Sequence, residues 1–104
     1  MLRFEVISAV DIDKYVNNKK ALIIDVRSPE EYEKKHIESS INIPFEKLER
    51  DYDKMPMDLI LILYCARGGS SMLAAKELFD RGHTVKALMG GINSYKGKYL
   101  SNSH

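Results

Sequence analysis

The only cysteine of this 104-residue chain, Cys65, stands where an apolar segment gives way to a glycine-containing loop. Residues 59–64 (LILILY) are short, continuous and apolar, which is typical of a strand covered on both faces. The loop residues that follow the cysteine are Ala66, Arg67, Gly68, Gly69, Ser70 and Ser71. Ligands of open α/β sheets bind beyond the carboxyl ends of the strands, and Cys65 is predicted at such an end.

The loop provides a way to hold negative charge beside Cys65. A tight glycine loop that leads into a helix turns several backbone N–H groups toward one point, and the helix dipole favours an anion there. Both effects lower the pKa of a thiol below its free value of about 8.5, and Arg67 adds a cation to the same loop. The alternative is a cysteine packed in the core, but the loop context favours a reactive thiolate.

A thiolate held in this way suits sulfur transfer. It attacks the outer sulfur of a donor such as thiosulfate, sulfite leaves, and the persulfide on Cys65 persists until an acceptor takes the sulfur. The rival chemistry is phosphoryl transfer by a cysteine phosphatase, which requires an arginine clamp at the position that Ser71 occupies. The sequence also lacks the G-x-x-x-x-G-K-[ST] pattern of a nucleotide loop.

Strand patterns alternate with helical patterns along the chain. Residues 21–24 resemble residues 59–64 in being short and apolar, and residues 84–88 are predicted to form a further strand. Shorter strands are predicted at residues 4–7 and around residues 41–43. This alternation predicts an α/β layer fold with a parallel sheet and right-handed crossovers.

Capping signals and apolar faces predict the helices between these strands. Ser8 with Asp11, and Ser28 with Pro29 and Glu31, have the form of capping boxes. The residues that share an apolar helical face are Ile12, Tyr15 and Val16 in the first helix and Met72, Ala75, Leu78 and Phe79 in a later one. Gly82 is a natural stop for the later helix. A helix from Pro44 through Leu48 and a last helical turn after Gly90 and Gly91 complete the pattern.

Composition limits the kind of protein that this can be. A hydrophobic content of 44% in a chain of this length predicts one domain, over residues 1–100, with a disordered tail at 101–104. The net charge of +1 is spread along the chain, which argues against binding to nucleic acid or to an acidic membrane surface. No run is long enough to span a membrane and no signal peptide is evident, so we expect a cytoplasmic protein. One cysteine and scattered histidines predict no disulfide, no metal site and no cofactor.

Four motifs of the chain resemble those of the rhodanese (thiosulfate sulfurtransferase) family and occur in the same order. In length the chain resembles the small single-domain bacterial members of that family. Residues 25–32 (DVRSPEEY) are similar to the family's D-V-R-x-x-x-E-[FY], and residues 36–37 and 42–44 (HI and NIP) to its following G-H-I-x-G-A-x-N-I-P. Residues 65–71 fit its active-site loop, C-x-x-G-x-[RS], with the following serine. Residues 89–92 (MGGI) resemble its late L-x-G-G-[IW].

The resemblance implies a five-stranded parallel sheet flanked by helices on both faces, with Cys65 as the sulfur-carrying nucleophile. It further implies that the loop binds the substrate and the persulfide through its backbone amides, and that Asp25 and Arg27 lie close by. For this pair, structural support beneath the site is favoured over contact with the substrate. His36 is likewise expected to be structural and not an acid or base.

The chain departs from the family pattern around the site. Lys35 and Ser39 replace glycines, and Tyr95 stands near a common tryptophan position. Ser70 occupies a loop position often held by arginine, and Glu31 puts an acid where certain two-domain members use an arginine. We therefore expect anion affinity to depend mainly on Arg67 and the affinity for thiosulfate to be weak.

Three functions are compatible with the sequence. The leading hypothesis is a thiosulfate:cyanide sulfurtransferase that takes sulfur from a small anionic donor or a protein persulfide. It then passes the sulfur to a thiol, a thioredoxin-like or sulfur-relay protein, or cyanide. The second hypothesis is a non-catalytic carrier or interaction module of the same fold. A small phosphatase or arsenate reductase is the third, against which Ser71 and the loop length argue.

Overall fold

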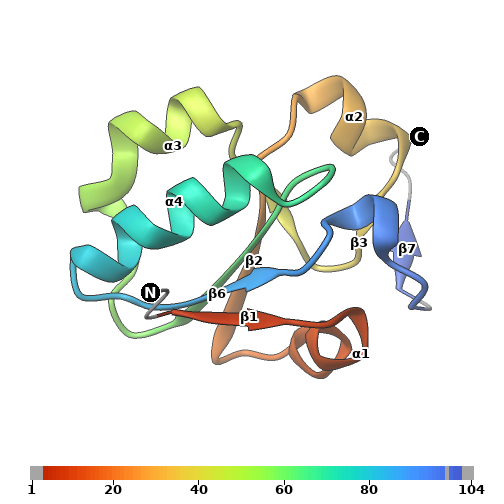
Figure 1. Ribbon diagram of the computed structural model, residues 1–104, viewed down its shortest axis with the longest axis horizontal. Coiled ribbons are helices and arrows are strands. Elements are labelled where there is room, and N and C mark those ends of the chain that lie inside the picture. The colour runs from red at the N-terminus through yellow and green to blue at the C-terminus, as the bar shows by residue number, and fades with distance from the viewer. Residues whose placement is uncertain (1–3, 98, 102–104) are drawn as a thin grey trace.

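The computed structural model describes residues 4–97 and 99–101 and shows a layered α/β fold (Figure 1). The strands are β1 (Glu5–Ile7), β2 (Ala21–Asp25), β3 (His36–Ile37), β4 (Ile41–Asn42), β5 (Ile60–Tyr64), β6 (Thr84–Leu88) and β7 (Leu100–Ser101). The α-helices are α1 (Ala9–Ile12), α2 (Pro29–Lys34), α3 (Phe45–Asp51) and α4 (Gly69–Asp80). Short 3-10 segments are η1 (Asp13–Tyr15), η2 (Tyr52–Lys54) and η3 (Ile92–Ser94).

The central sheet has five strands in the order β1-β6-β5-β2-β4, all parallel. β5 lies in the middle, where Leu63 pairs with Ile24 of β2 and with Ala87 of β6. Parallel neighbours need crossover connections, which the helices provide. The predicted five-stranded parallel sheet is confirmed, and its strands all end at one edge, where Cys65 follows β5.

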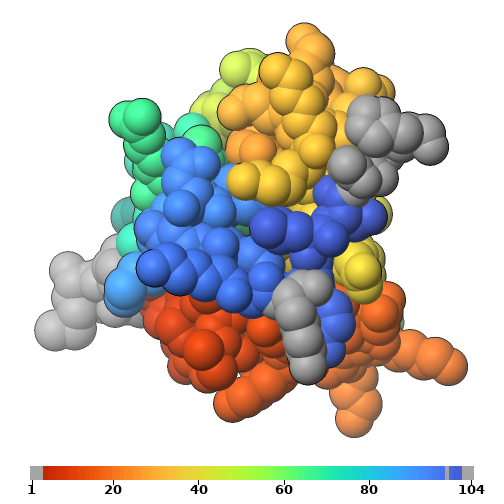
Figure 2. Space-filling view, turned by 90° about the vertical axis from the view of Figure 1, so that its right-hand side faces the viewer, coloured from red at the N-terminus to blue at the C-terminus, as the bar shows by residue number. Residues whose placement is uncertain are grey.

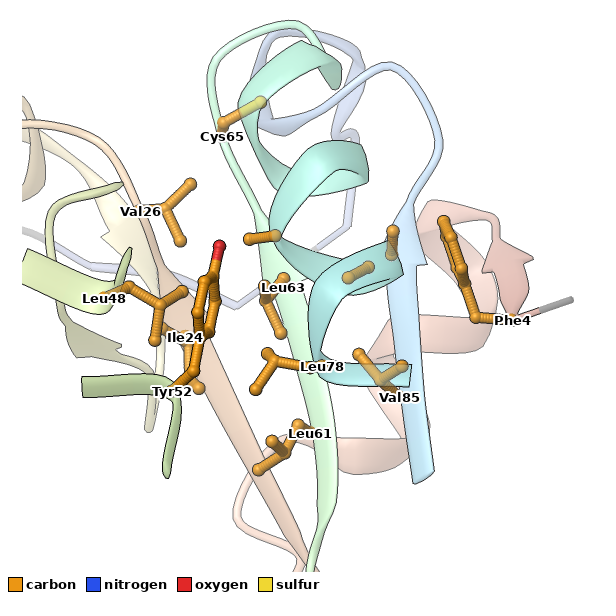
Figure 3. Packing of buried hydrophobic residues seen from close by; sticks show 13 residues of the cluster. Phe4, Ile24, Val26, Leu48, Tyr52, Leu61, Leu63, Cys65, Leu78 and Val85 are labelled. Carbon is orange, nitrogen blue, oxygen red and sulfur yellow. The ribbon is translucent and has the colours of Figure 1, made fainter. Parts of the chain in front are cut away.

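Side chains of β5 alternate between two hydrophobic clusters, one on each face of the sheet. Leu61, Leu63 and Cys65 belong to the cluster beneath α3 and α4 (Figure 3). Ile62 and Tyr64 belong to the other cluster, which includes residues of α1 and η3. Because both faces of β5 are covered, its sequence is continuously apolar instead of alternating. Helices on both faces are therefore confirmed as well.

Local capping chemistry fixes the helix ends as the sequence predicts. Ser28 Oγ accepts a hydrogen bond from the Glu31 N–H at 3.3 Å, and Glu31 Oε1 accepts one from the Ser28 N–H at 3.4 Å, which completes the capping box of α2. Ser8 caps α1 by accepting from the Asp11 N–H at 3.4 Å. Gly82, with φ +96°, follows the end of α4 and adopts the left-handed conformation that terminates helices.

Several elements differ in extent from the sequence-based expectation. α1 is a single short turn continued by η1, and α4 begins at Gly69, before the apolar face at Met72. α3 extends beyond Leu48 to Asp51, because Leu48 and the following Tyr52 both pack into the core. β4 holds Ile41 and Asn42 but not Ile43.

The antiparallel pair β3–β7 was not predicted. His36 pairs with Ser101 and Ile37 with Leu100, so Ser101 belongs to a strand and not to the predicted tail. Two-residue strands leave no periodicity in the sequence, and their partners are far apart along the chain. Residues 102–104, the rest of that predicted tail, lie outside the described residues.

Figure 2 views the molecule from the right-hand side of Figure 1, the side toward which β1 and β6 run. The blue segment after β6 lies between the red to orange segment around α1 and the gold segment around α2, and the green loop region lies at the upper left. Hydrogen bonds across this edge join Met89 N to Ile7 O at 2.8 Å and Ile92 N to Cys65 O at 2.8 Å. None of the helices in the described part of the chain is long and apolar enough to cross a membrane.

Two leucines of α4 provide a test of this packing. Leu78 is 0% exposed beneath the helix, whereas Leu73 is 66% exposed. We expect Leu78→Ala to lower the free energy of unfolding by about 2 to 5 kcal/mol and Leu73→Ala to change it by less than about 0.5 kcal/mol. Urea denaturation followed by circular dichroism measures both, and equal losses would show that the described face of α4 is wrong.

Candidate active site

Cys65 lies at the carboxyl end of β5, directly before the loop that leads into α4 (Figure 3). The residue is 6% exposed. The N–H of Gly68 donates a hydrogen bond to Cys65 Sγ at 2.9 Å. The thiol donates to Ser71 Oγ at 3.5 Å, and that hydroxyl donates to the Gly68 carbonyl at 3.2 Å. The sulfur is therefore surrounded by groups of its own loop.

Cys65 Sγ occupies the place of a capping side chain at the start of α4. The N-cap residue of this helix is Gly68, which has no side chain to satisfy the first N–H groups, and the first turn contains no acid. Gly68 has φ +106°, a conformation that a residue with a Cβ adopts only with strain. Backbone N–H groups at the start of α4 and the positive end of the helix dipole therefore stabilise a negative charge on Cys65 Sγ.

These contacts determine the pKa of the Cys65 thiol. Burial raises the pKa because it removes water from the thiolate. Hydrogen bonds that the Ser71 hydroxyl and the Ser71, Gly68 and Arg67 N–H groups donate to the thiolate lower the pKa, and their sum exceeds the effect of burial. The net result is a pKa below the ordinary value of a cysteine, so the fraction of thiolate at neutral pH is increased.

The segment that begins at Gly90 and Gly91 is hydrogen-bonded to the backbone of the Cys65 loop. Ile92 N donates to Cys65 O at 2.8 Å and Asn93 N donates to Ala66 O at 3.0 Å. A Cβ on Gly91 would lie 2.4 Å from Cys65 O and 2.5 Å from Ala66 O, so only glycine permits this close approach. The Cys65 loop and the segment of Gly90 and Gly91 therefore lie against each other.

Asp25 and Arg27 form a buried ion pair beside the loop. Asp25 ends β2 and pairs in register with Tyr64, the residue before Cys65. Arg27 Nη2 donates to Asp25 Oδ2 at 2.7 Å and to the Lys35 carbonyl at 2.6 Å. The Asp25 side chain is 0% exposed and that of Arg27 is 8% exposed. Burial lowers the pKa of Arg27, but the hydrogen bonds and charge of Asp25 outweigh it, so the guanidinium remains charged.

A pocket of about 400 Å³ opens next to Cys65. The first turns of α2, α3 and α4 meet around it, and Val26 and Ala66 complete the wall. The lining residues are Val26, Arg27, Ser28, Glu31, Phe45, Glu46, Cys65, Ala66, Gly69 and Ser70. The pocket therefore gives a small molecule a route to the cysteine.

The predicted loop residues lie at different places around this pocket. Ala66, Gly69 and Ser70 line the pocket. Gly68 and Ser71 are not among the lining residues, but they form hydrogen bonds with Cys65 Sγ. Arg67 is exposed and is not among the lining residues, so its placement gives no support to a main role in anion affinity.

Phe45 and Glu46 line the pocket but were not singled out from the sequence. The signal that points to them is the helix start after Pro44, since first-turn residues of a helix that begins at this edge face the site. The loop that leads to them is held by Phe45 N, which donates to Val26 O at 3.0 Å.

His36 has a structural environment. It is 8% exposed, its Nδ1 lies 2.7 Å from the Tyr32 carbonyl, and its ring stacks on that of Tyr32 with centroids 3.9 Å apart. It is not among the residues that line the pocket. Tyr95 is 6% exposed and donates to Asp13 Oδ1 at 2.5 Å.

The rhodanese-like domain model matches residues 8–98, almost the whole length of the chain. The chain belongs to the rhodanese-like family. It is 27% identical over 99 residues to the thiosulfate sulfurtransferase GlpE of Coxiella burnetii, covering 94% of this chain and 92% of that protein. A rhodanese-related protein from Thermoplasma volcanium has a solved structure with a TM-score of 0.84 and 30% identity. That match covers 94% of this chain and 98% of the other.

Other curated relatives of the rhodanese-like domain are much longer. The tRNA sulfurtransferase of Desulfurococcus amylolyticus is 37% identical over 76 residues, which cover 73% of this chain and 15% of that protein. The first curated relatives that the chain matches are covered over only 15% to 25% of their length. The same domain thus occurs both as a near full-length protein and as part of larger proteins.

The hydrogen bonds to Cys65 Sγ predict a shift in thiol titration. In Ser71→Ala the hydroxyl contact that lowers the pKa is lost, so the pKa rises and less thiolate is present at any pH below it. The rate of alkylation by iodoacetamide is measured by intact mass at a series of pH values. The midpoint of its rise with pH is expected at a higher pH than in the wild type.

Ser70→Ala is the matched control, because Ser70 lines the pocket and is exposed. Its midpoint is expected to equal that of the wild type. An unchanged midpoint in Ser71→Ala would refute the contribution of this hydroxyl.

Proposed function

We propose that this rhodanese-like domain is a sulfurtransferase that carries sulfane sulfur as a persulfide on Cys65. The observation that supports the proposal most directly is the position of Cys65 Sγ at the N-terminus of α4. The N-cap residue Gly68 has no side chain there, and its N–H donates to the sulfur at 2.9 Å. A thiolate there is stabilised by backbone groups that are already in place. The names of relatives, thiosulfate sulfurtransferase and tRNA sulfurtransferase, support the same chemistry.

The proposed transfer has two displacement steps. In the first, the Cys65 thiolate attacks the outer sulfur of thiosulfate or of a donor persulfide. A new S–S bond forms to Cys65, the donor's S–S bond breaks, and sulfite or a thiolate leaves with the bonding electron pair. In the second step, an acceptor thiolate or cyanide attacks the outer sulfur of the Cys65 persulfide. The electron pair of that S–S bond returns to Cys65 Sγ and regenerates the thiolate.

The surrounding residues support these steps without acting as acid or base. The first-turn N–H groups of α4, at Gly69 and Ser70, are proposed to bind the outer sulfur of the persulfide in the pocket. Asp25 and Arg27 are proposed to support the pocket wall, since their charges are paired with each other. The proposed donors are small sulfur-containing anions or protein persulfides, and the proposed acceptors are thiols of small molecules or of sulfur-relay proteins.

A second candidate is a sulfur carrier or interaction module that transfers sulfur only within a complex. Relatives in which the domain is a small part of a longer protein favour it. Turnover separates the two functions, because an enzyme regenerates its thiolate with a free acceptor and such a module does not.

Intact-mass analysis of the purified protein tests the proposal. Brief treatment with thiosulfate is expected to add the mass of one sulfur atom, and cyanide is expected to remove it. Since Cys65 is the only cysteine, Cys65→Ser must lose the adduct completely. A protein with a free, alkylatable thiol that gains no sulfur from thiosulfate or from a persulfide donor would contradict the proposal. An adduct that forms but is never released to cyanide or a free thiol would favour the carrier.

A further inference from the structure

The pocket beside Cys65 contains charges that differ in their accessibility. Apart from Cys65, its ionisable lining residues are Arg27, Glu31 and Glu46. The Arg27 side chain is only 8% exposed and donates to both carboxylate oxygens of Asp25 at 2.7 to 3.1 Å. Its positive charge is therefore compensated within the protein. Glu31 and Glu46 are exposed, so an entering molecule meets a negative rim.

Helix geometry explains why these two acids stand at the pocket. Glu31 is at the third position of α2, where its Oε1 accepts from Ser28 N at 3.4 Å and from Ser28 Oγ at 3.1 Å. Glu46 is in the first turn of α3. Acids at helix N-termini stabilise the helix, which accounts for their presence. Because both N-termini line the pocket, the same acids also determine the charge that a substrate meets.

We propose that Glu31 and Glu46 set the charge specificity of this site. They disfavour dianionic donors such as thiosulfate and favour a thiol or persulfide with a positive charge a few atoms from the sulfur. This inference rests on the proposed sulfur transfer at Cys65. The favoured acceptor carries an ammonium or guanidinium group to the rim, while its thiolate attacks the outer sulfur of the Cys65 persulfide. The acceptor leaves as its own persulfide and Cys65 returns to the thiolate.

Two kinds of acceptor combine a thiol with a nearby positive charge. One is a small amine thiol, and the other is a peptide cysteine flanked by lysine or arginine. Exposed carboxylates act through water, so their combined effect on rate is modest, about 3- to 10-fold for each change of substrate charge. Added salt screens such interactions and reduces the preference.

Variants that keep the fold while removing the charge test the proposal. Glu31→Gln preserves the capping box, since glutamine also serves at this position, and Glu46→Gln keeps the side-chain shape. The control is the double variant Glu33→Gln and Glu49→Gln, which changes the net charge by the same amount. Glu33 and Glu49 are exposed on α2 and α3 and are not among the residues that line the pocket.

The experiment measures sulfur transfer by intact mass in both directions. Persulfide formation is followed with thiosulfate. Discharge of the Cys65 persulfide is followed with cysteamine, 2-mercaptoethanol and 3-mercaptopropionate, which carry positive, zero and negative charge. Two short peptides, one with a cysteine between lysines and one with a cysteine between glutamates, distinguish a peptide acceptor from a small amine thiol.

In the Glu31→Gln, Glu46→Gln protein the ratio of cysteamine to 3-mercaptopropionate rates is expected to fall by about 10-fold or more relative to wild type, because the two thiols differ by two units of charge. Its persulfide formation from thiosulfate is expected to accelerate by a similar factor. The control protein is expected to match wild type in both. Using ratios between variants removes the different intrinsic reactivities of the thiols.

The possible failures are distinguishable. If the persulfide forms but the ratios are the same in all proteins, or shift equally in the control, the charge specificity is wrong and the sulfur transfer stands. If no protein gains sulfur on Cys65 from any donor, the proposed function itself is wrong.

Discussion

The cap that Cys65 Sγ forms on α4 is the interaction on which the site depends. Two other helices are capped by side chains: Ser8 Oγ accepts an N–H of the first turn of α1, and Ser28 Oγ accepts one of α2. At α4 the N-cap is Gly68, and the sulfur of the preceding strand end accepts its N–H instead. A negative charge on this sulfur improves the interaction, so the N–H groups at the start of the helix stabilise the thiolate.

Buried contacts from distant parts of the chain keep that arrangement in place. The segment of Gly91 and Ile92 approaches the carbonyls of Cys65 and Ala66 so closely that no Cβ fits. On the other side, Asp25 and Arg27 form an ion pair with almost no exposure to solvent. Such a pair is costly to break, which makes it a rigid support and not a free cation for binding substrate. Rigidity of the loop matters because the N–H groups stabilise an anion only when they are already oriented.

The walls of the pocket are formed largely by the N-termini of α2, α3 and α4, and the first-turn residues of these helices therefore determine which charges surround it. Each N-terminus favours acids in its first turn, and α2 and α3 contain Glu31 and Glu46 there. α4 contains no acid in its first turn, so the positive end of its dipole interacts with Cys65 Sγ instead. The charges around the pocket thus lie on exposed first turns, whereas Cys65 and its hydrogen-bond partner Ser71 are buried.

The sequence by itself determined the strands β2, β5 and β6, the capping box of α2, the parallel α/β architecture and the place of Cys65 before a helix. These features follow from local patterns: continuous apolar runs, side-chain caps and glycines at turns. Only the tertiary structure decided that Arg67 is outside the pocket lining while Phe45 and Glu46 belong to it, and that β3 pairs with β7. The physical reason is that a pocket and a two-residue ladder are formed by segments far apart in the chain, whose meeting depends on packing across the whole sheet.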